Sequence, residues 1–466
     1  MVIRRTLPRS TAVLLLPVVL AACAALPAPE VSSRTVPLPQ VLPAMKSFPP
    51  APPGKGRPHS NADLARDFLE LSFNMESGKR LPRLTRFETP VTVAFDRPQN
   101  AQFQADLSDL LGRVRKEAGI DIRQGATGTT ANITIFTLPR RILRAAVPKA
   151  ACFVVPRVHG WREFKRARRN GQLDWSTLKR RERASIFIPS DISPQEARDC
   201  LHEEITQALG PLNDIYRLPD SIYNDDNMNA VLTRFDMLIL RTYYDPALKN
   251  GMSEAAVRRA LPAILKRLHP AGEGLASDGI SRTPRLWVET LETALSTRSS
   301  PAKRLLYARK AVAMAKKNGW QDNRLGFALF VLGRLSLGRD SKTAIASFSR
   351  SYALYSRIYG KADIHTAHVA LQLSAFALST GHVADALKLV NANLPTVIDA
   401  QNATLLATYL MIKAEALDDL GRHRAAATVR LDSIAWARYG FADLQEIRKR
   451  LAETTALKPS LKKLRF

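Results

Sequence analysis

The sequence predicts an α+β domain followed by an all-α domain of helical repeats. Between residues 61 and 209, β-rich runs alternate with segments whose apolar residues recur at helical spacing. After residue 301 the β-rich runs end, and glycine-containing turns recur between apolar helices at Gly338, Gly381 and Gly421, which are 43 and 40 residues apart. Two kinds of structure therefore follow one another along the chain, and we expect a linker at residues 271–300.

The first residues predict export. A basic start at residues 4–9 precedes a short apolar stretch that is too short to span a membrane permanently. The run Leu20-Ala-Ala-Cys23 then matches a bacterial lipobox. We expect residues 1–22 to be a signal peptide and Cys23 to become the lipid-modified N-terminus, which would anchor the chain in a membrane. A plain signal peptide cut nearby is the alternative.

The residues after the cysteine predict where the chain is attached. Ala24 follows Cys23, and this favours an outer-membrane lipoprotein that faces the periplasm, because aspartate is the usual inner-membrane signal at this position. Residues 23–59 are rich in proline, which predicts an extended and poorly packed tether.

The α+β domain is expected at residues 60–270. Its predicted elements, in order, are a helix at 61–75, a strand at 90–95, a helix at 101–117, strands at 132–137, 152–155 and 184–189, and a helix at 194–209. We therefore expect a small mixed sheet, backed by helices, whose last strand leads into the final helix.

The helix at 194–209 has well-marked ends. Ser193 is a good N-cap, Pro194 suits the first helical position, and Glu196 completes a capping box. At the other end Gly210 is expected to take the left-handed C′ conformation, and Pro211 cannot continue the helix.

This helix has the outline of a metallopeptidase site. Metzincin peptidases carry H-E-x-x-H-x-x-G-x-x-H. From Glu203 the sequence reads E-E-x-x-Q-x-x-G-x-x-N and continues with Asp214. A catalytic role would make Glu204 the general base and would place a divalent metal, the one cofactor these residues suggest, among Glu203, Gln207, Asn213 and Asp214. One carboxylate and two amides hold zinc weakly and suit calcium or magnesium better. We therefore favour a buried hydrogen-bonded network without catalysis.

The stretch from Cys200 to Asp214 resembles a bacterial family catalogued as domain of unknown function 2927, and the likeness continues through residues 218–226, 232–236 and 240–252. The family is similar to the metzincin peptidases, so the resemblance implies a metzincin-like fold for the first domain. It implies no established activity.

Cys152 and Cys200 are the two cysteines beyond the lipobox, and both lie in the family-like region. In an oxidising periplasm they could form a disulfide that joins helix to sheet. Two buried free thiols are the alternative.

The chain is strongly basic, with a formal net charge of +27. Basic residues crowd residues 157–183, with aromatic residues between them. An exported protein rarely meets nucleic acid, so anionic lipid or an acidic cell-wall polymer is the expected partner. A solvated basic surface without a ligand is the alternative. The candidate anion-binding residues are Arg162, Lys165, Arg166, Arg168, Arg169, Lys179, Arg180 and Arg181.

The second half, residues 301–457, resembles tetratricopeptide repeats of extended length. Each glycine turn separates two predicted helices, and further helices are expected near residues 302–317 and 444–454. Such arrays bind proteins or peptides and do not carry out chemistry. The end, residues 458–466, is a basic tail.

Three functions fit these observations, and we favour the first. The first is a membrane-anchored envelope scaffold with a non-catalytic peptidase-like domain and a protein-binding helical array. The second is a metal-dependent peptidase or amidase of the envelope. The third is a structural binder of acidic cell-wall or lipid groups through residues 157–183. The sequence lacks a G-x-S-x-G motif, a P-loop and a glycine-rich dinucleotide motif, so it does not support serine hydrolase, nucleotide-hydrolysing or dinucleotide-dependent chemistry.

Overall fold

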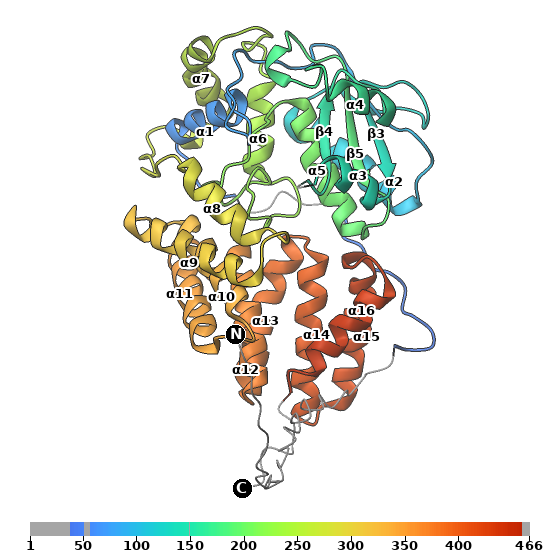
Figure 1. The fold of residues 1–466 in the computed structure, drawn as a ribbon, viewed down its shortest axis with the longest axis vertical. Coiled ribbons are helices and arrows are strands. Elements are labelled where there is room, and N and C mark those ends of the chain that lie inside the picture. The colour runs from blue at the N-terminus through green and yellow to red at the C-terminus, as the bar shows by residue number, and fades with distance from the viewer. Residues whose placement is uncertain (1–37, 51–55, 149, 459–466) are drawn as a thin grey trace, which may run out of the picture.

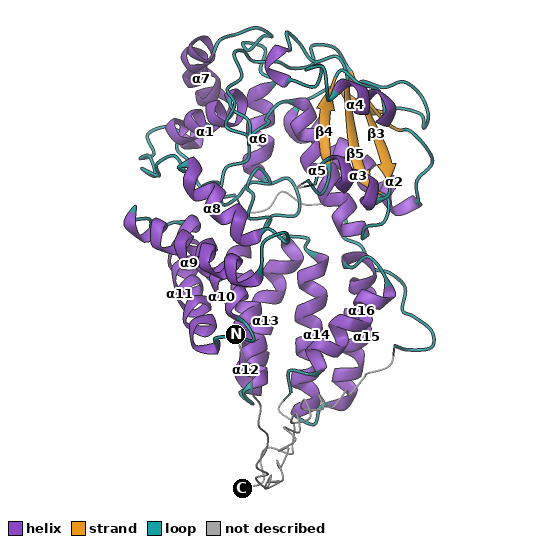
Figure 2. Ribbon diagram, viewed as in Figure 1, coloured by secondary structure: helices purple, strands orange, loops and turns teal. Residues whose placement is uncertain are grey.

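The computed structural model describes residues 38–50, 56–148 and 150–458 (Figure 1). The predicted signal peptide, Cys23 and the tail beyond residue 458 lie outside this part of the chain. In the described part, no helix is both long enough and apolar enough to cross a membrane. Figures 1 and 2 show a part containing the sheet stacked on a purely helical part.

A five-stranded mixed sheet forms one side of the first part, in the order β2-β1-β3-β5-β4. Only β4 runs antiparallel, against β5, and the other pairs are parallel. The prediction of a small mixed sheet is confirmed, although the short β2 was not predicted. The strands are β1 (Val91–Phe95), β2 (Ile122–Gln124), β3 (Ile133–Leu138), β4 (Phe153–Pro156) and β5 (Ala184–Pro189).

Helices cover both faces of the sheet, and alternate residues of β5 show this. Ile186 and Ile188 face the main core, into which α2 and α5 pack, whereas Phe187 faces a smaller core under α3 and α4. The remaining helices, α1, α6 and α7, share a third core beside the sheet. The bounds are α1 (Asn61–Phe73), α2 (Ala101–Arg113, continued by a π-helical turn at Val114–Ala118), α3 (Arg140–Ala146), α4 (Trp161–Ala167), α5 (Pro194–Leu209), α6 (Arg234–Tyr243) and α7 (Glu254–Leu268).

The second part is a run of helices in which neighbours along the chain pack together. The predicted glycine turns are present, because Gly338, Gly381 and Gly421 all have positive φ angles, which glycine adopts without steric cost. The helices are α8 (Arg285–Leu295), α9 (Pro301–Lys317), α10 (Asn323–Ser336), α11 (Ser341–Tyr359), α12 (Ile364–Ser379), α13 (Val383–Asp399), α14 (Ala403–Asp419), α15 (His423–Gly440) and α16 (Leu444–Thr455).

Part of the expected linker at 271–300 is an ordered helix. Helix α8 lies inside it and packs against α9. The indole of Trp287 is fully buried and donates a hydrogen bond to the Ala311 carbonyl at 3.0 Å. The helical part therefore begins at α8, before residue 301.

The described part of the expected tether is also packed. Residues 38–50 form no helix or strand, and they lie along the C-terminal helices. Phe48 packs on Trp436 with ring centroids 4.5 Å apart, and Arg438 donates to the Pro43 carbonyl at 2.6 Å. Apolar partners in the C-terminal helices make this segment part of the fold, which proline content alone did not reveal.

Candidate functional site

Helix α5 is held in place at both ends. The predicted capping box is present, with Ser193 accepting from the Glu196 amide and Glu196 accepting from the Ser193 amide. At the C-terminal end, Gly210 does not take the predicted left-handed conformation, because its φ is −168°. A Cβ there would lie 2.9 Å from the Tyr243 ring, so glycine is needed for close packing.

The predicted disulfide is confirmed. Cys152 and Cys200 are bonded, with their Cα atoms 6.0 Å apart, and join the start of β4 to α5. This link fixes the face of α5 that carries the next two candidate residues.

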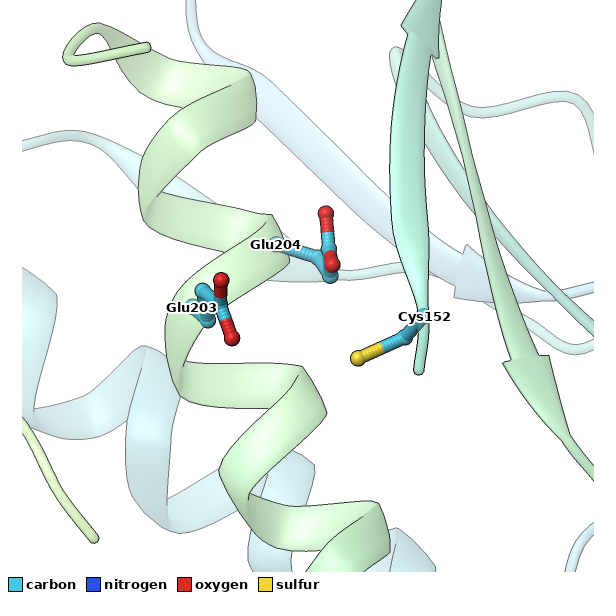
Figure 3. Close-up of side chains that lie close together, drawn as sticks. All are labelled: Cys152, Glu203 and Glu204. Carbon is cyan, nitrogen blue, oxygen red and sulfur yellow. The ribbon is translucent and has the colours of Figure 1, made fainter. Parts of the chain in front are cut away.

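Glu203 and Glu204 lie one turn further along α5, beside this disulfide. One side-chain oxygen of each carboxylate and the Cys152 sulfur lie within 4.8 Å of one another (Figure 3). Because the sulfur is bonded to Cys200, it is not a free thiolate and cannot serve as an ordinary metal ligand. Two carboxylates from adjacent residues remain.

The amide side chains at the other predicted ligand positions form hydrogen bonds within the protein. Asn213 donates from Nδ2 to the Glu70 carbonyl at 3.2 Å, and Gln207 donates from Nε2 to Asp214 at 3.5 Å. His202, on a different face of α5, accepts the Leu232 amide at Nδ1. Burial among cationic side chains holds the pKa of His202 well below its usual value, so the ring is neutral.

Two further acidic residues, which sequence reasoning did not single out, complete the group. Glu76 follows α1, and Asp225 lies in the loop before α6. Both interact electrostatically with Glu203, and Glu76 forms a hydrogen bond with Asp214. We call Glu76, Glu203, Glu204, Asp214 and Asp225 the carboxylate cluster. Asp225 belongs to the Asn-Asp-Asp run of the family-like region, and that run was the one available signal.

Burial and repulsion from neighbouring acids favour the protonated form of four of these carboxyls, Glu203, Glu204, Asp214 and Asp225. Burial, with the nearby charges of Glu76 and Asp225, raises the pKa of Glu203 to about 8. Burial and crowding by other acids raise the pKa of Asp225 to about 7. The pKa values of Glu204 and Asp214 are raised well above their usual range, first by burial and then by neighbouring carboxylates.

These residues do not fit a zinc site. Catalytic zinc takes three protein ligands, most often imidazoles with carboxylates or thiolates. Here the sulfur is bonded, the Asn213 amide is engaged with backbone, and no imidazole of the described chain joins the acidic pair. An ion at Glu203 and Glu204 would have to be a hard cation held mainly by oxygen.

The comparison with protein families bears on this segment. Residues 61–263 match the family described as "Protein of unknown function (DUF2927)". The predicted resemblance to that family is therefore confirmed for this region. No curated protein and no solved structure gives a significant match to the chain.

The candidate anion-binding residues of the DUF2927-like region fall into two groups. Seven are exposed, on or near α4 and in the loop before β5: Arg162, Lys165, Arg166, Arg168, Arg169, Lys179 and Arg180. The aromatic rings between them are not free to stack on a ligand. Trp161 and Phe164 pack on Phe187, and Trp175 is buried.

Arg181 is different, because it is buried and points inward. Only 4% of it is exposed. Its guanidinium donates to the carbonyls of Gln207, Ala208 and Gly210 at 2.5 to 2.7 Å and lies over the Trp175 ring. Arg181 is therefore not part of the exposed basic surface, and it caps the carbonyl groups at the C-terminal end of α5.

A cleft of about 1360 Å³ opens beside the carboxylate cluster. Its walls come from the loops after α1 and α5, from the segment before β4, and from α8 with the turn into α9. Glu76, Asp214 and Asp225 line it, whereas Glu203 and Glu204 are not among its lining residues. We call it the interlobe cleft.

Proposed function

We propose that the protein is an exported, membrane-anchored scaffold or binding protein of the cell envelope, with a non-catalytic peptidase-like domain and a protein-binding helical array. The observation that carries the proposal is the use made of the metzincin positions. Asn213 is bound to the Glu70 carbonyl, Gln207 to Asp214, and the sulfur nearest Glu203 is in a disulfide. A hydrogen-bonded network occupies the place of a metal-ligand set.

The arrangement of elements supports the finer fold assignments within this proposal. A mixed sheet whose last strand leads into the motif helix is what a metzincin-like domain requires. Consecutive helical hairpins with left-handed glycines at their turns are typical of tetratricopeptide-like arrays, which recruit protein or peptide partners.

Metal analysis tests the non-catalytic assignment. The purified full-length chain should contain substoichiometric zinc, and Glu203→Ala should leave that content unchanged, because the ligand set is incomplete. Incubation with peptide and cell-wall amide substrates should give no hydrolysis that depends on Glu204.

One observation favours a second function, a metal-dependent peptidase or amidase. Glu203 and Glu204 converge, as a metal ligand beside a general base would, and burial raises the pKa of Glu204 above its usual value, which suits a proton acceptor. Stoichiometric zinc that is lost in Glu203→Ala, together with hydrolysis that is lost in Glu204→Gln, would establish this function in place of the first.

The envelope location is tested at Cys23. The lipid on this residue would give stable anchoring in the outer membrane, facing the periplasm, and the seven exposed basic residues would add attraction to anionic lipids or cell-wall polymers. Cys23→Ser should release most of the protein from membranes, and its residual binding to anionic vesicles should fall with added salt. Unchanged membrane retention in fractionated cells would contradict the anchor.

A further inference from the structure

The interlobe cleft has walls of opposite charge. Glu76, Asp214 and Asp225 line one wall, on the DUF2927-like side. Arg298 and Lys303, from the turn between α8 and α9 and the start of α9, line another part, and Arg144 of α3 adds a third basic side chain. A ligand in the cleft can therefore contact both acidic and basic side chains.

The carboxyls of the acidic wall lack ion-pair partners among the described residues, although arginine side chains are close to them. Within the described chain, Glu70 of the same cleft forms ion pairs with Arg217 and Arg282, but Glu76, Asp214 and Asp225 form none. Arg285 is near Asp225, yet its guanidinium is turned to Glu289 and to the Glu76 carbonyl oxygen. When the carboxyls of this wall lose their protons, their negative charge has no ion-pair partner in the described chain and is available to an outside group.

A second, independent observation marks the same place. Glu204 is only 2% exposed, and its Oε2 has no hydrogen-bond partner, an arrangement that is costly for a buried carboxyl. Asp214 also has a buried oxygen, Oδ1, without a partner. Figure 3 shows Glu203 and Glu204 pointing into the space between α5 and the start of β4, and Ala151, just before this strand, lines the cleft.

The basic wall also lacks ion-pair partners within the described chain, although Lys303 lies over the Tyr307 ring. Arg144, Arg298 and Lys303 are exposed, and none forms an ion pair with a described carboxylate. In this they differ from Arg282 and Arg285 of the same cleft, which are paired with Glu70 and Glu289.

We propose that the interlobe cleft binds a short peptide, or a peptide carried on a polymer, that has a free amine and a free carboxylate. The amine lies against Asp214, Asp225 and Glu76, and the carboxylate lies against Arg298 and Lys303. This inference rests on the proposed function, because it names the ligand class of that binding protein.

The size and donor geometry favour a peptide over a metal ion. The volume exceeds the roughly 300–1000 Å³ that accommodates a drug-sized molecule, so several residues of a peptide fit. An ammonium group donates three hydrogen bonds and tolerates carboxylates that are spread along a wall. A metal ion needs its ligands within a few ångström of one point. The one group of three or more such ligands among the described residues is Cys152, Glu203 and Glu204, and its sulfur is in a disulfide.

Calorimetric titration of the full-length chain in detergent tests this assignment. The probes are a lysine-containing tetrapeptide with free termini, its fully N-acetylated form and its C-terminal amide. The free peptide should bind, and each blocked form should bind at least about tenfold more weakly. Binding should strengthen from pH 6 to pH 8 and release protons, because the amine favours ionised carboxylates.

Variants locate the site. Asp225→Asn and Arg298→Glu should each weaken binding of the free peptide about tenfold or more. Asp385→Asn on α13 and Arg350→Glu on α11, both exposed and outside the cleft lining, are the matched controls and should bind as the parent does. Arg298 is a surface residue, so its variant remains informative if Asp225→Asn fails to fold.

Several results would overturn the inference. They are equal binding of free and blocked peptides, equal losses in the cleft and control variants, or no peptide binding at all. Mass spectrometry of the recovered peptide separates this failure from failure of the proposed function. Intact peptide without binding removes only the ligand assignment, whereas cleaved peptide contradicts the non-catalytic role itself.

Discussion

At the scale of single residues, Arg181 controls the position of the candidate site. A helix end leaves carbonyl oxygens without partners, and here the Arg181 guanidinium satisfies those of Gln207, Ala208 and Gly210. The same group lies 4.8 Å from the centre of the Trp175 ring. The loop that carries Asp214 begins directly after these carbonyls, so Arg181 positions one wall of the interlobe cleft.

Arg181→Met should lower the free energy of unfolding by about 2–5 kcal/mol, because buried carbonyls lose their donor and the aromatic contact is lost. Chemical denaturation measures the change. Arg180→Met, at the exposed neighbouring residue, is the control and should change stability by less than about 0.5 kcal/mol. Similar losses in both variants would contradict the role given to Arg181.

The structural roles of Arg181 and Gly210 could not be predicted from the sequence. A run of basic residues does not reveal which member turns inward, and the partners of Arg181 lie 26 to 29 residues away. Gly210 was expected to allow a left-handed backbone conformation. Instead, the lack of a side chain at Gly210 allows the Tyr243 ring of another helix to pack closely against it. By contrast, the capping box of α5 was predicted because Ser193 and Glu196 are three residues apart.

At the scale of elements, local signals predicted most helices and strands well. Helix α5 has the predicted bounds, and α10 to α15 lie on either side of the predicted glycine turns. Strand β2 was missed because it has three residues. Such short elements are set by tertiary contacts, which a local pattern does not contain. Helix α8 was missed although its apolar residues Trp287, Leu291 and Ala294 recur at helical spacing.

A buried ion-pair network joins elements of both parts of the chain. His365 of α12 is fully buried, with Nδ1 3.0 Å from Asp363 and Nε2 3.3 Å from Asp226 in the loop before α6. Arg57 adds a second cation to Asp363. Hydrogen bonds and charge from Asp226 and Asp363 outweigh burial and raise the pKa of His365 to about 9.

This network predicts a pH dependence of stability. Because the folded pKa of His365 lies above the unfolded value of about 6.5, its contribution is complete below pH 6.5 and disappears as the pH rises through 9. His365→Gln should therefore cost about 3–5 kcal/mol near pH 6 and much less near pH 10, since it leaves Asp226 without a cation. Thermal unfolding across this range measures the difference.

His382→Gln, at an exposed histidine of the same array, is the matched control and should leave the pH profile of stability unchanged. A constant difference between the parent and His365→Gln from pH 6 to pH 10 would contradict the charged state of His365.

At the scale of the whole molecule, the two parts and the N-terminal segment form a continuous structure. Arg198 of α5 donates to Gln401 between α13 and α14, and Tyr439 of α15 donates to Asp106 of α2. Residues 38–50 run along the C-terminal helices, and Gln401 also donates to the carbonyl of Pro49. The sequence predicted two domains and a tether, but not these contacts, because their partners are hundreds of residues apart.

The interlobe cleft is a product of this packing, and so only part of the site was predictable. Glu203, Glu204 and Asp214 were singled out from one helix and the loop after it. Glu76 comes from the end of another helix, and Arg298 comes from the helical part. The opposite charges of the two walls appear only when both parts are assembled.

The central claim is that α5 carries buried, protonated carboxyls at Glu203 and Glu204 and not a metal centre. Carbon-13 NMR titration of the glutamate carboxyls, with and without one equivalent of zinc and with Glu203→Gln for assignment, tests it most directly. The account predicts that Glu203 titrates near pH 8 and that zinc does not shift this titration. Titration of every glutamate between about pH 4 and 5, or displacement of the Glu203 proton by stoichiometric zinc, would contradict it.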